Sequence, residues 1–331
     1  MSAADFSKSE ASNPDGAWIE LQDQVLVRVS GPGTDKFLHG QFSQNLDDVT
    51  ANNSPRAAAA TPKGRAFALV RLVRHGDDIL FNLPASSADP ILSHLNKYLM
   101  LFRGTEMSVE PDGRLLGIIG TPLAEALQSG AAHKLDRAGA TMSLGNHRLI
   151  RTQDTAEGLS RFEFWQLEPL DEALADVFTP ERQGTQSQWR ASEIAAGVAA
   201  LDPETREKYV PQMLNWQHLD GLHFNKGCYT GQEVIARMHF LGQLKKSLFR
   251  LRAESRETAP ASGTPVMAES RPAGEVVNAV SLPDGSVEML AVLRHDSVNS
   301  SLTLGDTDTP VALLPLPYIV TERDGGATAD T

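Results

Sequence analysis

The stretch from Leu222 to Lys246, LHFNKGCYTGQEVIARMHFLGQLKK, holds the only cysteine in the sequence, Cys228. Thr230 is followed three residues later by Glu233, just before an apolar run, and this spacing is that of a capping box. It predicts a helix that starts at Gly231. Cys228 then lies two residues outside the helix, close to the positive end of the helix dipole, which favours the thiolate over the thiol.

The octet of residues 226–233, KGCYTGQE, also has ordinary structural explanations. A lone cysteine is commonly an inert, buried small hydrophobe, and Tyr229 can pack on the helix that follows as a hydrophobic staple. Lys226 favours the functional alternative, because its ammonium beside Cys228 again favours the thiolate. Gln232 is least explained by structure, since its amide in the first turn can reach outward to a ligand. Cys228 and Lys226 are therefore the candidates for chemistry.

Length and composition are those of a soluble globular protein of two or three domains. The chain has 331 residues, 41% of them hydrophobic and 22% charged, and a formal net charge of −12, which argues against a general nucleic-acid binder. One segment departs from this acidic average. Residues 221–252 hold six basic residues against Glu233 alone, a local charge of +5 that predicts a basic face suited to an anionic ligand: Lys226, Arg237, Lys245, Lys246, Arg250 and Arg252.

A single cysteine excludes an internal disulfide and any all-cysteine metal or cluster site within one chain, and we expect no metal site. No apolar run approaches the roughly 18 residues that a membrane span requires, and the first twenty residues lack a signal-peptide core. We therefore expect a cytoplasmic protein that makes no contact with a membrane.

The order of the predicted elements indicates an α+β fold rather than a doubly wound sheet. Residues 56–61 and 65–74 form a predicted β-hairpin around the turn Pro62-Lys63-Gly64. Asp89-Pro90 predicts a helix start, and the apolar residues that follow recur at helical spacing, which indicates a stripe packed on a sheet. No glycine-rich phosphate loop is present, so a nucleotide-binding fold is not supported.

After Lys246 the pattern changes to short strands separated by Gly, Pro, Asp and Asn. Several such strands within about seventy residues indicate a small β-barrel. The predicted strands are residues 247–253, 265–267, 274–282, 286–294 and 301–304.

The octet, with Tyr209-Val210-Pro211-Gln212 before it and Arg237 after it, resembles the signature of the YgfZ family of folate-binding proteins, relatives of the glycine-cleavage aminomethyltransferase. The resemblance spans roughly residues 21–318. Further matches are Gly31 to Gln41, the Pro62-Lys63-Gly64-Arg65 turn, Lys97-Tyr98, Trp189, Asn215 and Leu316-Pro317-Tyr318.

This resemblance implies a three-lobed fold of two ferredoxin-like α+β domains and a C-terminal β-barrel, with tetrahydrofolate or a one-carbon derivative in the central opening. The implied folate-binding α+β lobe is discontinuous, with residues 17–50 and 112–242. A second α+β lobe, residues 51–111, is inserted between them, the barrel takes residues 243–320, and residues 1–16 and 321–331 are loose termini.

Carried over by position, Cys228 is the family's hallmark thiol and Trp189 matches a tryptophan that contacts folate. A second folate-contacting tryptophan of some members falls at Gln24 here, although Trp18 lies close by in sequence. An aromatic wall and directed amides suit a pterin ring, and cations suit the anionic glutamate tail. The implied cofactor-binding residues are Trp189, Asn215, Tyr229, Gln232 and Arg237, with Lys226 or Lys245 as further partners for the tail.

The resemblance implies a folate-binding accessory protein that supports iron-sulfur enzymes, among them one that thiomethylates tRNA, and we expect a monomer without stable direct nucleic-acid binding. One alternative is a folate-dependent aminomethyl or methyl transferase, which needs a carboxylate beside the reactive carbon. Asp47 and Asp48 are the candidates for it. A further alternative is an RNA-binding module that uses the basic face, and the net charge of −12 disfavours it.

Overall fold

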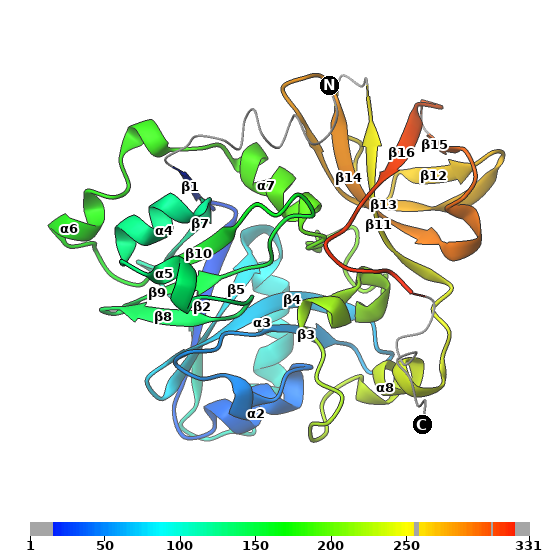
Figure 1. Cartoon of the computed structure of the whole chain (residues 1–331). Helices are drawn as coiled ribbons and strands as arrows, with labels where there is room; N and C mark the ends of the chain where they lie inside the picture. Colours follow the sequence, from blue (N-terminus) through cyan, green and yellow to red (C-terminus); the bar gives the residue numbers. More distant parts are fainter. Residues whose placement is uncertain (1–15, 255–257, 306, 322–331) are drawn as a thin grey trace, which may run out of the picture.

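The central segment of the chain, residues 196–231, lies between three lobes (Figure 1). The computed structural model describes residues 16–254, 258–305 and 307–321, so the predicted loose termini lie almost wholly outside the described residues. The central segment contains two 3-10 helices, η3 (Pro211–Leu214) and η4 (Trp216–Leu219), and leads into α8 (Gln232–Leu241). The octet thus lies at the end of the central segment, where it contacts the first lobe.

The first lobe is an antiparallel sheet of strand order β3-β4-β5-β2-β6 with α2 and α3 packed against it. Residues 57–60 of β3 are all alanine, and all are buried. Because side chains alternate along a strand, Ala57 and Ala59 face the core of this lobe, while Ala58 and Ala60 face the central segment. The elements are β2 (Gln24–Ser30), α2 (Thr34–Gln41), η1 (Leu46–Asp48), β3 (Arg56–Ala60), β4 (Ala66–His75), β5 (Asp78–Pro84), α3 (Ala85–Leu99) and β6 (Glu106–Val109).

The second lobe is an antiparallel sheet of order β1-β7-β10-β9-β8, with α4 and α7 packed on it. Ile118, Phe162 and Phe164 on its strands share a core with Leu123 of α4. The elements are β1 (Ala17–Glu20), β7 (Arg114–Ile119), α4 (Thr121–Leu127), α5 (Ala131–Lys134), β8 (Thr141–Leu144), β9 (His147–Arg151), β10 (Arg161–Gln166), α6 (Glu172–Ala175), η2 (Pro180–Arg182) and α7 (Gln186–Ala195).

The third lobe is a closed barrel of strand order β11-β14-β13-β12-β15-β16, which confirms the barrel predicted after Lys246. Val276, Met289 and Leu293 lie in its core. The last strand, β16, was not predicted, and none of its residues is buried. The elements are β11 (Lys246–Ala253), β12 (Pro265–Ala268), β13 (Arg271–Ser281), β14 (Val287–Arg294), η5 (His295–Ser297), β15 (Leu302–Leu304) and β16 (Pro310–Leu314).

The predicted hairpin of residues 56–74 is present as β3 and β4. The predicted start of α3 at Asp89 is wrong, because the helix begins at Ala85 and contains Pro90. Pro90 is the sixth residue of the helix, where its missing N–H removes a single intrahelical hydrogen bond. The expected apolar stripe is confirmed, with Ile91, Leu95 and Leu99 buried.

The sheets divide the chain at other positions than the expected lobes do. β2 lies before residue 50 but pairs with β5 and β6, so it belongs to the sheet of the 51–111 segment. Only β1 of the N-terminal piece joins the sheet of residues 114–166. The chain therefore crosses between the two lobes in the short turn at residues 21–23.

Candidate functional site

The predicted capping box of Thr230 and Glu233 does not form. α8 begins at Gln232, and its N-cap is Gly231, whose φ of 85° is left-handed and whose position has no side-chain cap. The backbone N–H of Thr230 donates instead to the carbonyl of Gly40 at 3.1 Å. Because the left-handed turn at Gly231 separates Thr230 from the helix, its hydroxyl precedes the cap position instead of occupying it.

Gly231 also allows the octet to pack closely on the β3–β4 turn. A Cβ atom at this position would lie 2.5 Å from the carbonyl oxygen of Thr61. Across the same contact, a Cβ atom at Gly64 would lie 2.7 Å from the side chain of Val234 on α8. Both glycines have positive φ, so the turn and the octet fit together only without side chains at these two positions.

Lys226 points into the protein and holds the octet to the end of α2. Its ammonium donates to the carbonyls of His39 at 2.6 Å and Phe42 at 2.7 Å and lies 4.7 Å from the ring centroid of Tyr229. Burial lowers the pKa of the Lys226 ammonium to about 7, against a smaller opposing effect of the Cys228 thiol. Lys226 therefore changes charge near neutral pH beside Cys228, which is exposed.

Two of the predicted cofactor-binding residues are parts of the core. Tyr229 packs with Trp216 and Ile235, and burial raises the pKa of its hydroxyl. Asn215 is 1% exposed and has a left-handed φ of 58°. Its amide donates to the carbonyl of Leu248 at 2.9 Å, which ties the central segment to the barrel.

Gln232 and Arg237 lie on α8, the helix that follows the candidate thiol in the chain. The Oε1 atom of Gln232 accepts a hydrogen bond from the backbone N–H of Tyr229 at 3.3 Å, so its amide holds the loop that contains Cys228. Arg237 is exposed. The structure therefore brings Gln232, the first residue of α8, to the loop that holds Lys226 and Cys228, and leaves Arg237 exposed on α8.

A cavity lies where the first lobe, the second lobe and the barrel meet. The candidate Trp189 lines it, and so does Gln24. Of the other candidate residues, all of which lie in the described part of the chain, none lines this cavity. Its main polar and aromatic lining residues are Gln24, Arg56, Glu163, Trp189, Glu193 and Trp216.

Trp189 is 5% exposed, and neighbouring groups already contact its ring. The Arg161 guanidinium lies over the ring at 4.3 Å from the centroid, and a Cβ atom at Gly117 would lie 2.4 Å from a ring carbon. Trp189 is thus both a core residue of α7 and a wall of the cavity.

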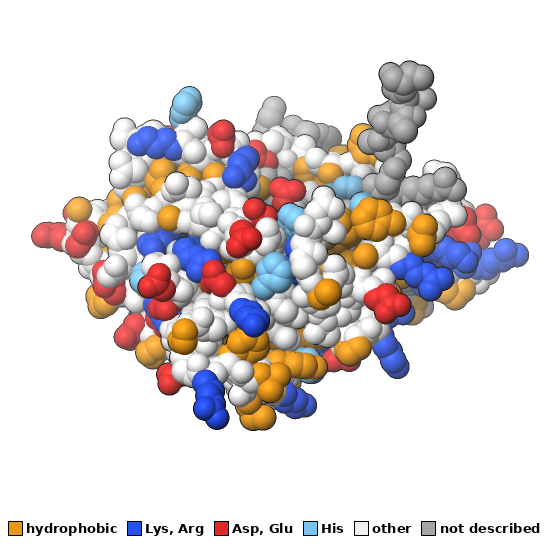
Figure 2. All heavy atoms as spheres, turned by 90° about the horizontal axis from the view of Figure 1, so that it is seen from below, with side chains coloured by type: hydrophobic (Ala, Val, Ile, Leu, Met, Phe, Trp, Pro, Cys, Tyr) orange, Lys and Arg blue, Asp and Glu red, His pale blue; other side chains and the backbone are white. Residues whose placement is uncertain are grey.

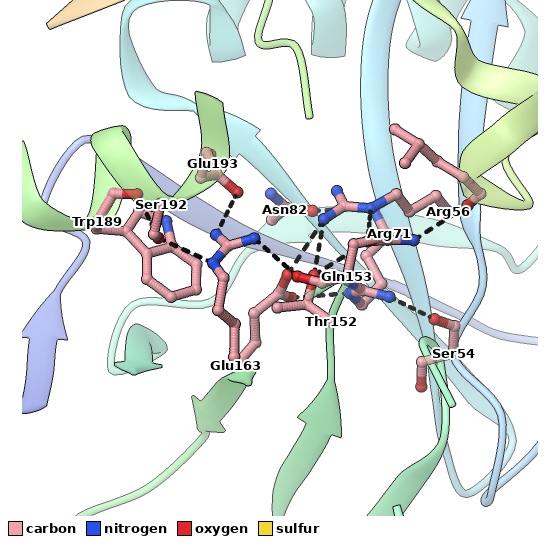
Figure 3. A network of polar contacts seen from close by, with 12 residues as sticks. Ser54, Arg56, Arg71, Asn82, Thr152, Gln153, Glu163, Trp189, Ser192 and Glu193 are labelled. Atoms are coloured by element: carbon pink, nitrogen blue, oxygen red, sulfur yellow. Dashed lines mark hydrogen bonds and ion pairs between the residues drawn. The ribbon is translucent and has the colours of Figure 1, made fainter. Parts of the chain in front are cut away.

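Sequence reasoning missed the buried ionic network beside this cavity (Figure 3). Arg71 donates to both carboxylate oxygens of Glu163, at 2.8 and 3.0 Å. Arg161 donates to Glu193 at 3.3 Å, and Arg56 donates to the side chains of Gln153 and Thr152, each at 2.9 Å.

These contacts control the protonation of the network. Burial raises the pKa of the Glu163 carboxyl, but the Arg71 charge and hydrogen bonds outweigh burial and hold it at about 2. Burial, with the nearby Arg71 charge, lowers the pKa of Arg56 to about 10. The sequence contains one usable signal, since Arg161 and Glu163 alternate with aromatic residues in a buried strand, where charges need partners.

A second cavity of about 390 Å³ adjoins the first, and Arg56 lines both. Asp47 and Asp48, the candidate carboxylates of the transferase alternative, line this second cavity and not the one that Trp189 lines. The Asp48 carboxylate lies 3.4 Å from the ring of His223.

The predicted basic face is wrong for three of its six cations, which are paired with carboxylates or directed inward. Arg250 is buried in the barrel, 2.7 Å from both Glu288 and Glu157, and Arg252 is 2.7 Å from Asp284. Lys226 is also directed inward. On the face seen from below in Figure 1, basic and acidic side chains are interspersed (Figure 2). The exposed cations of the set are Arg237, Lys245 and Lys246.

Comparison with known proteins gives close relatives. The tRNA-modifying protein YgfZ of Yersinia enterocolitica is 33% identical over 320 residues, covering 92% of this chain and 93% of that protein. The protein of the same name from Shigella boydii is 32% identical over 316 residues, covering 92% and 94%. The chain belongs to the YgfZ family. No family model matches it.

A solved structure shares the fold of this YgfZ family member. The glycine cleavage system aminomethyltransferase T of Bartonella henselae matches with a TM-score of 0.71, covering 93% of this chain and 87% of that chain. The sequence identity is 15%, so this likeness establishes the fold alone. The expected α+β fold of aminomethyltransferase type, with its C-terminal barrel, is confirmed.

In this YgfZ family member, the loop that contains Cys228 (the thiol loop) and the cavity that Trp189 lines are separate features. The central segment connects them. Trp216 lines the cavity and packs in the same cluster as Tyr229 of the octet. Within the described residues, no helix is long and apolar enough to cross a membrane.

Proposed function

We propose that this chain is a cytoplasmic, tetrahydrofolate-binding accessory protein that supports iron-sulfur enzymes in tRNA modification, including thiomethylation. Its relatives are named tRNA-modifying proteins, and its fold is that of an aminomethyltransferase. The observation that carries the folate part is the cavity at the junction of the lobes, which Trp189 and Trp216 line together with a few directed polar groups. Such a lining suits a flat, polar heterocycle.

The residues around the cavity fit a folate and would bind and orient it. Trp189 and Trp216 supply apolar walls, and Gln24 and Asn82 supply amides on the first-lobe side. Tetrahydrofolate, when bound, supplies a carrier for a one-carbon unit. The chain's own part is to hold the ring and to exclude water from it.

The Cys228 thiol serves a later step in this proposal, as a nucleophile or a transient ligand toward a partner enzyme. It is exposed, whereas the cavity that Trp189 lines lies between the lobes and does not include Cys228 in its lining. Lys226 holds the loop in place through two carbonyls and supplies a charge that varies near neutral pH.

Titration calorimetry with tetrahydrofolate tests the folate part on wild type, Trp189→Phe and Cys228→Ala. We expect binding to wild type and to Cys228→Ala, and weaker binding to Trp189→Phe, which keeps an aromatic core but shortens the wall. No binding to wild type would reject the folate proposal. The thiol part is tested in a deletion strain, where Cys228→Ala should fail to restore the activity of a tRNA-thiomethylating iron-sulfur enzyme, and full restoration would reject it.

The alternative of a folate-dependent aminomethyl or methyl transferase has one observation in its favour. Asp47 and Asp48 line the second cavity, which shares Arg56 with the cavity of Trp189. A carboxylate next to a bound folate can steer an amine. Turnover of tetrahydrofolate by the purified protein with an aminomethyl donor, lost in Asp48→Asn, would favour this alternative.

A further inference from the structure

Arg56 differs from the other buried arginines of the network in its hydrogen bonding. Arg71 and Arg161 each use all three guanidinium nitrogens as donors to protein groups. Arg56 uses Nε toward Gln153 and Nη2 toward Thr152, while its Nη1 makes no hydrogen bond with any described residue. Because Arg56 lines both cavities, this nitrogen is a donor available to a ligand.

Glu193 offers the complementary group. One carboxylate oxygen, Oε1, accepts from Arg161 at 3.3 Å, and Oε2 accepts from none of the described residues. The side chain is 25% exposed and lines the cavity. Glu193 follows Trp189 by four residues in α7, so the two side chains lie on the same face of that helix.

The charges that line the cavity favour a neutral polar ring over an anion. Arg56 and Arg190 face it together with Asp23, Glu163 and Glu193. Of these, Arg190 and Asp23 pair at 3.3 Å, and Glu163 is bound by Arg71 and lies 3.8 Å from Nη2 of Arg56. Two atoms of these charged side chains remain available to a ligand beside the aromatic walls. They are Nη1 of Arg56, a donor, and Oε2 of Glu193, an acceptor.

We infer that Arg56 and Glu193 determine the ligand specificity of this cavity by binding the ring of a 2-amino-4-oxo-pteridine. Arg56 donates to the ring carbonyl, and Glu193 accepts from the ring N–H and exocyclic amino group beside it. The doubly anionic glutamate tail is excluded from the cavity by the carboxylates there and lies outside it. This inference rests on the proposed folate function.

Calorimetry with three probes tests the assignment: tetrahydrofolate, 6-methyltetrahydropterin as the ring alone, and p-aminobenzoylglutamate as the tail alone. Arg56→Met should weaken binding of the first two by about ten- to hundredfold, the size expected for a charge-assisted hydrogen bond. Glu193→Gln should weaken the same two probes. Arg114→Ala is the matched control, because Arg114 does not line the cavity and is an exposed arginine that lies 3.7 Å from Glu20, and it should leave affinity nearly unchanged.

Unfolding midpoints of all variants show whether they remain folded. If Arg56→Met unfolds, Arg56→Lys replaces it. Its three donors sit on one nitrogen and lack the spread of the guanidinium fork, so affinity for the ring should still fall. Wild-type affinity for the ring in a folded Arg56 variant would overturn the inference while leaving folate binding intact. Tail binding that depends on Arg56 would also overturn it. Absence of tetrahydrofolate binding to wild type would instead reject the proposed function itself.

Discussion

The Lys226 ammonium donates a hydrogen bond at 2.7 Å to the backbone carbonyl of Phe42, 184 positions earlier in the chain. A second hydrogen bond reaches the carbonyl of His39. Both carbonyls lie at the end of α2, where the backbone acceptors of a helix lack intrahelical partners. Lys226 therefore satisfies these acceptors and fixes the thiol loop to the first lobe.

Replacement of Lys226 by Met should change how stability depends on pH. The pKa of this ammonium is about 7 in the folded protein and 10.5 ordinarily. Between these values the unfolded chain binds more protons, so this group makes the free energy of unfolding rise with pH. The cost of burying the charge is complete below pH 7 and absent above about pH 10.5. Wild type should therefore gain stability relative to Lys226→Met as pH rises from 7 to 10.

Chemical denaturation of both proteins at several pH values measures this difference. Lys63→Met, at the exposed β3–β4 turn, is the matched control, and its stability difference from wild type should not vary with pH in this way. A Lys226→Met profile parallel to wild type from pH 7 to 10 would show that the ammonium titrates normally.

Gly231→Ala should destabilise the protein more than alanine at a comparable open glycine. Gly231 and Gly145 both have left-handed φ, 85° and 60°, which costs an L residue about 1–2 kcal/mol. A Cβ atom at Gly231 also meets the carbonyl oxygen of Thr61 at 2.5 Å, whereas nothing lies within 4 Å of one at Gly145. The difference between the two variants in denaturant titrations therefore reports the contact between octet and turn. Equal losses would mean that the loop moves aside freely.

The octet shows which features of the site could be predicted from local sequence and which could not. Its position next to a helix start and the presence of Lys226 beside Cys228 were predictable from spacing. The left-handed φ of Gly231 was not, because it follows from the close approach of Thr61, which is distant in sequence. That contact displaces Thr230 from the cap. Tertiary packing thus prevented a capping box for which the residue types and the spacing of Thr230 and Glu233 were correct.

Charge was the least predictable property, because a linear sum does not reveal partners. Arg250 and Arg252 were counted toward the predicted basic face. In the structure, Arg250 pairs with Glu288 on β14, and Arg252 pairs with Asp284 in the turn that precedes β14. Arg56 received no role from sequence, since its importance depends on two cavities formed by three lobes. The fold class and the barrel were recoverable because the order of elements and the Gly, Pro, Asp and Asn residues between short strands are local signals, whereas the polar site is formed by distant segments.

Glu288→Gln should strongly destabilise the barrel. Glu288 is 4% exposed and lies 2.7 Å from Arg250 and 3.5 Å from Arg252. Removal of one partner from a buried ion pair typically costs about 3–5 kcal/mol, because the remaining charge stays in a poorly solvated place. Asp296→Asn is the control, since its pair with Arg294 is exposed, and it should leave the unfolding midpoint nearly unchanged. Similar midpoints for both variants would show that Glu157 and Asp284 suffice for the two arginines.

Alkylation of Cys228 should be independent of ligand binding in the cavity. Cys228 is the only cysteine of the chain and is exposed, so iodoacetamide should add one group per folded chain. Because Cys228 does not line the cavity of Trp189, saturating tetrahydrofolate should change the alkylation rate by less than about twofold. Mass spectrometry of timed samples measures the rate, and Cys228→Ala gives the unlabelled baseline. Full protection by tetrahydrofolate would place the thiol at the bound ligand and favour direct chemistry on folate, whereas an unchanged rate leaves the thiol free for a partner enzyme while folate is bound.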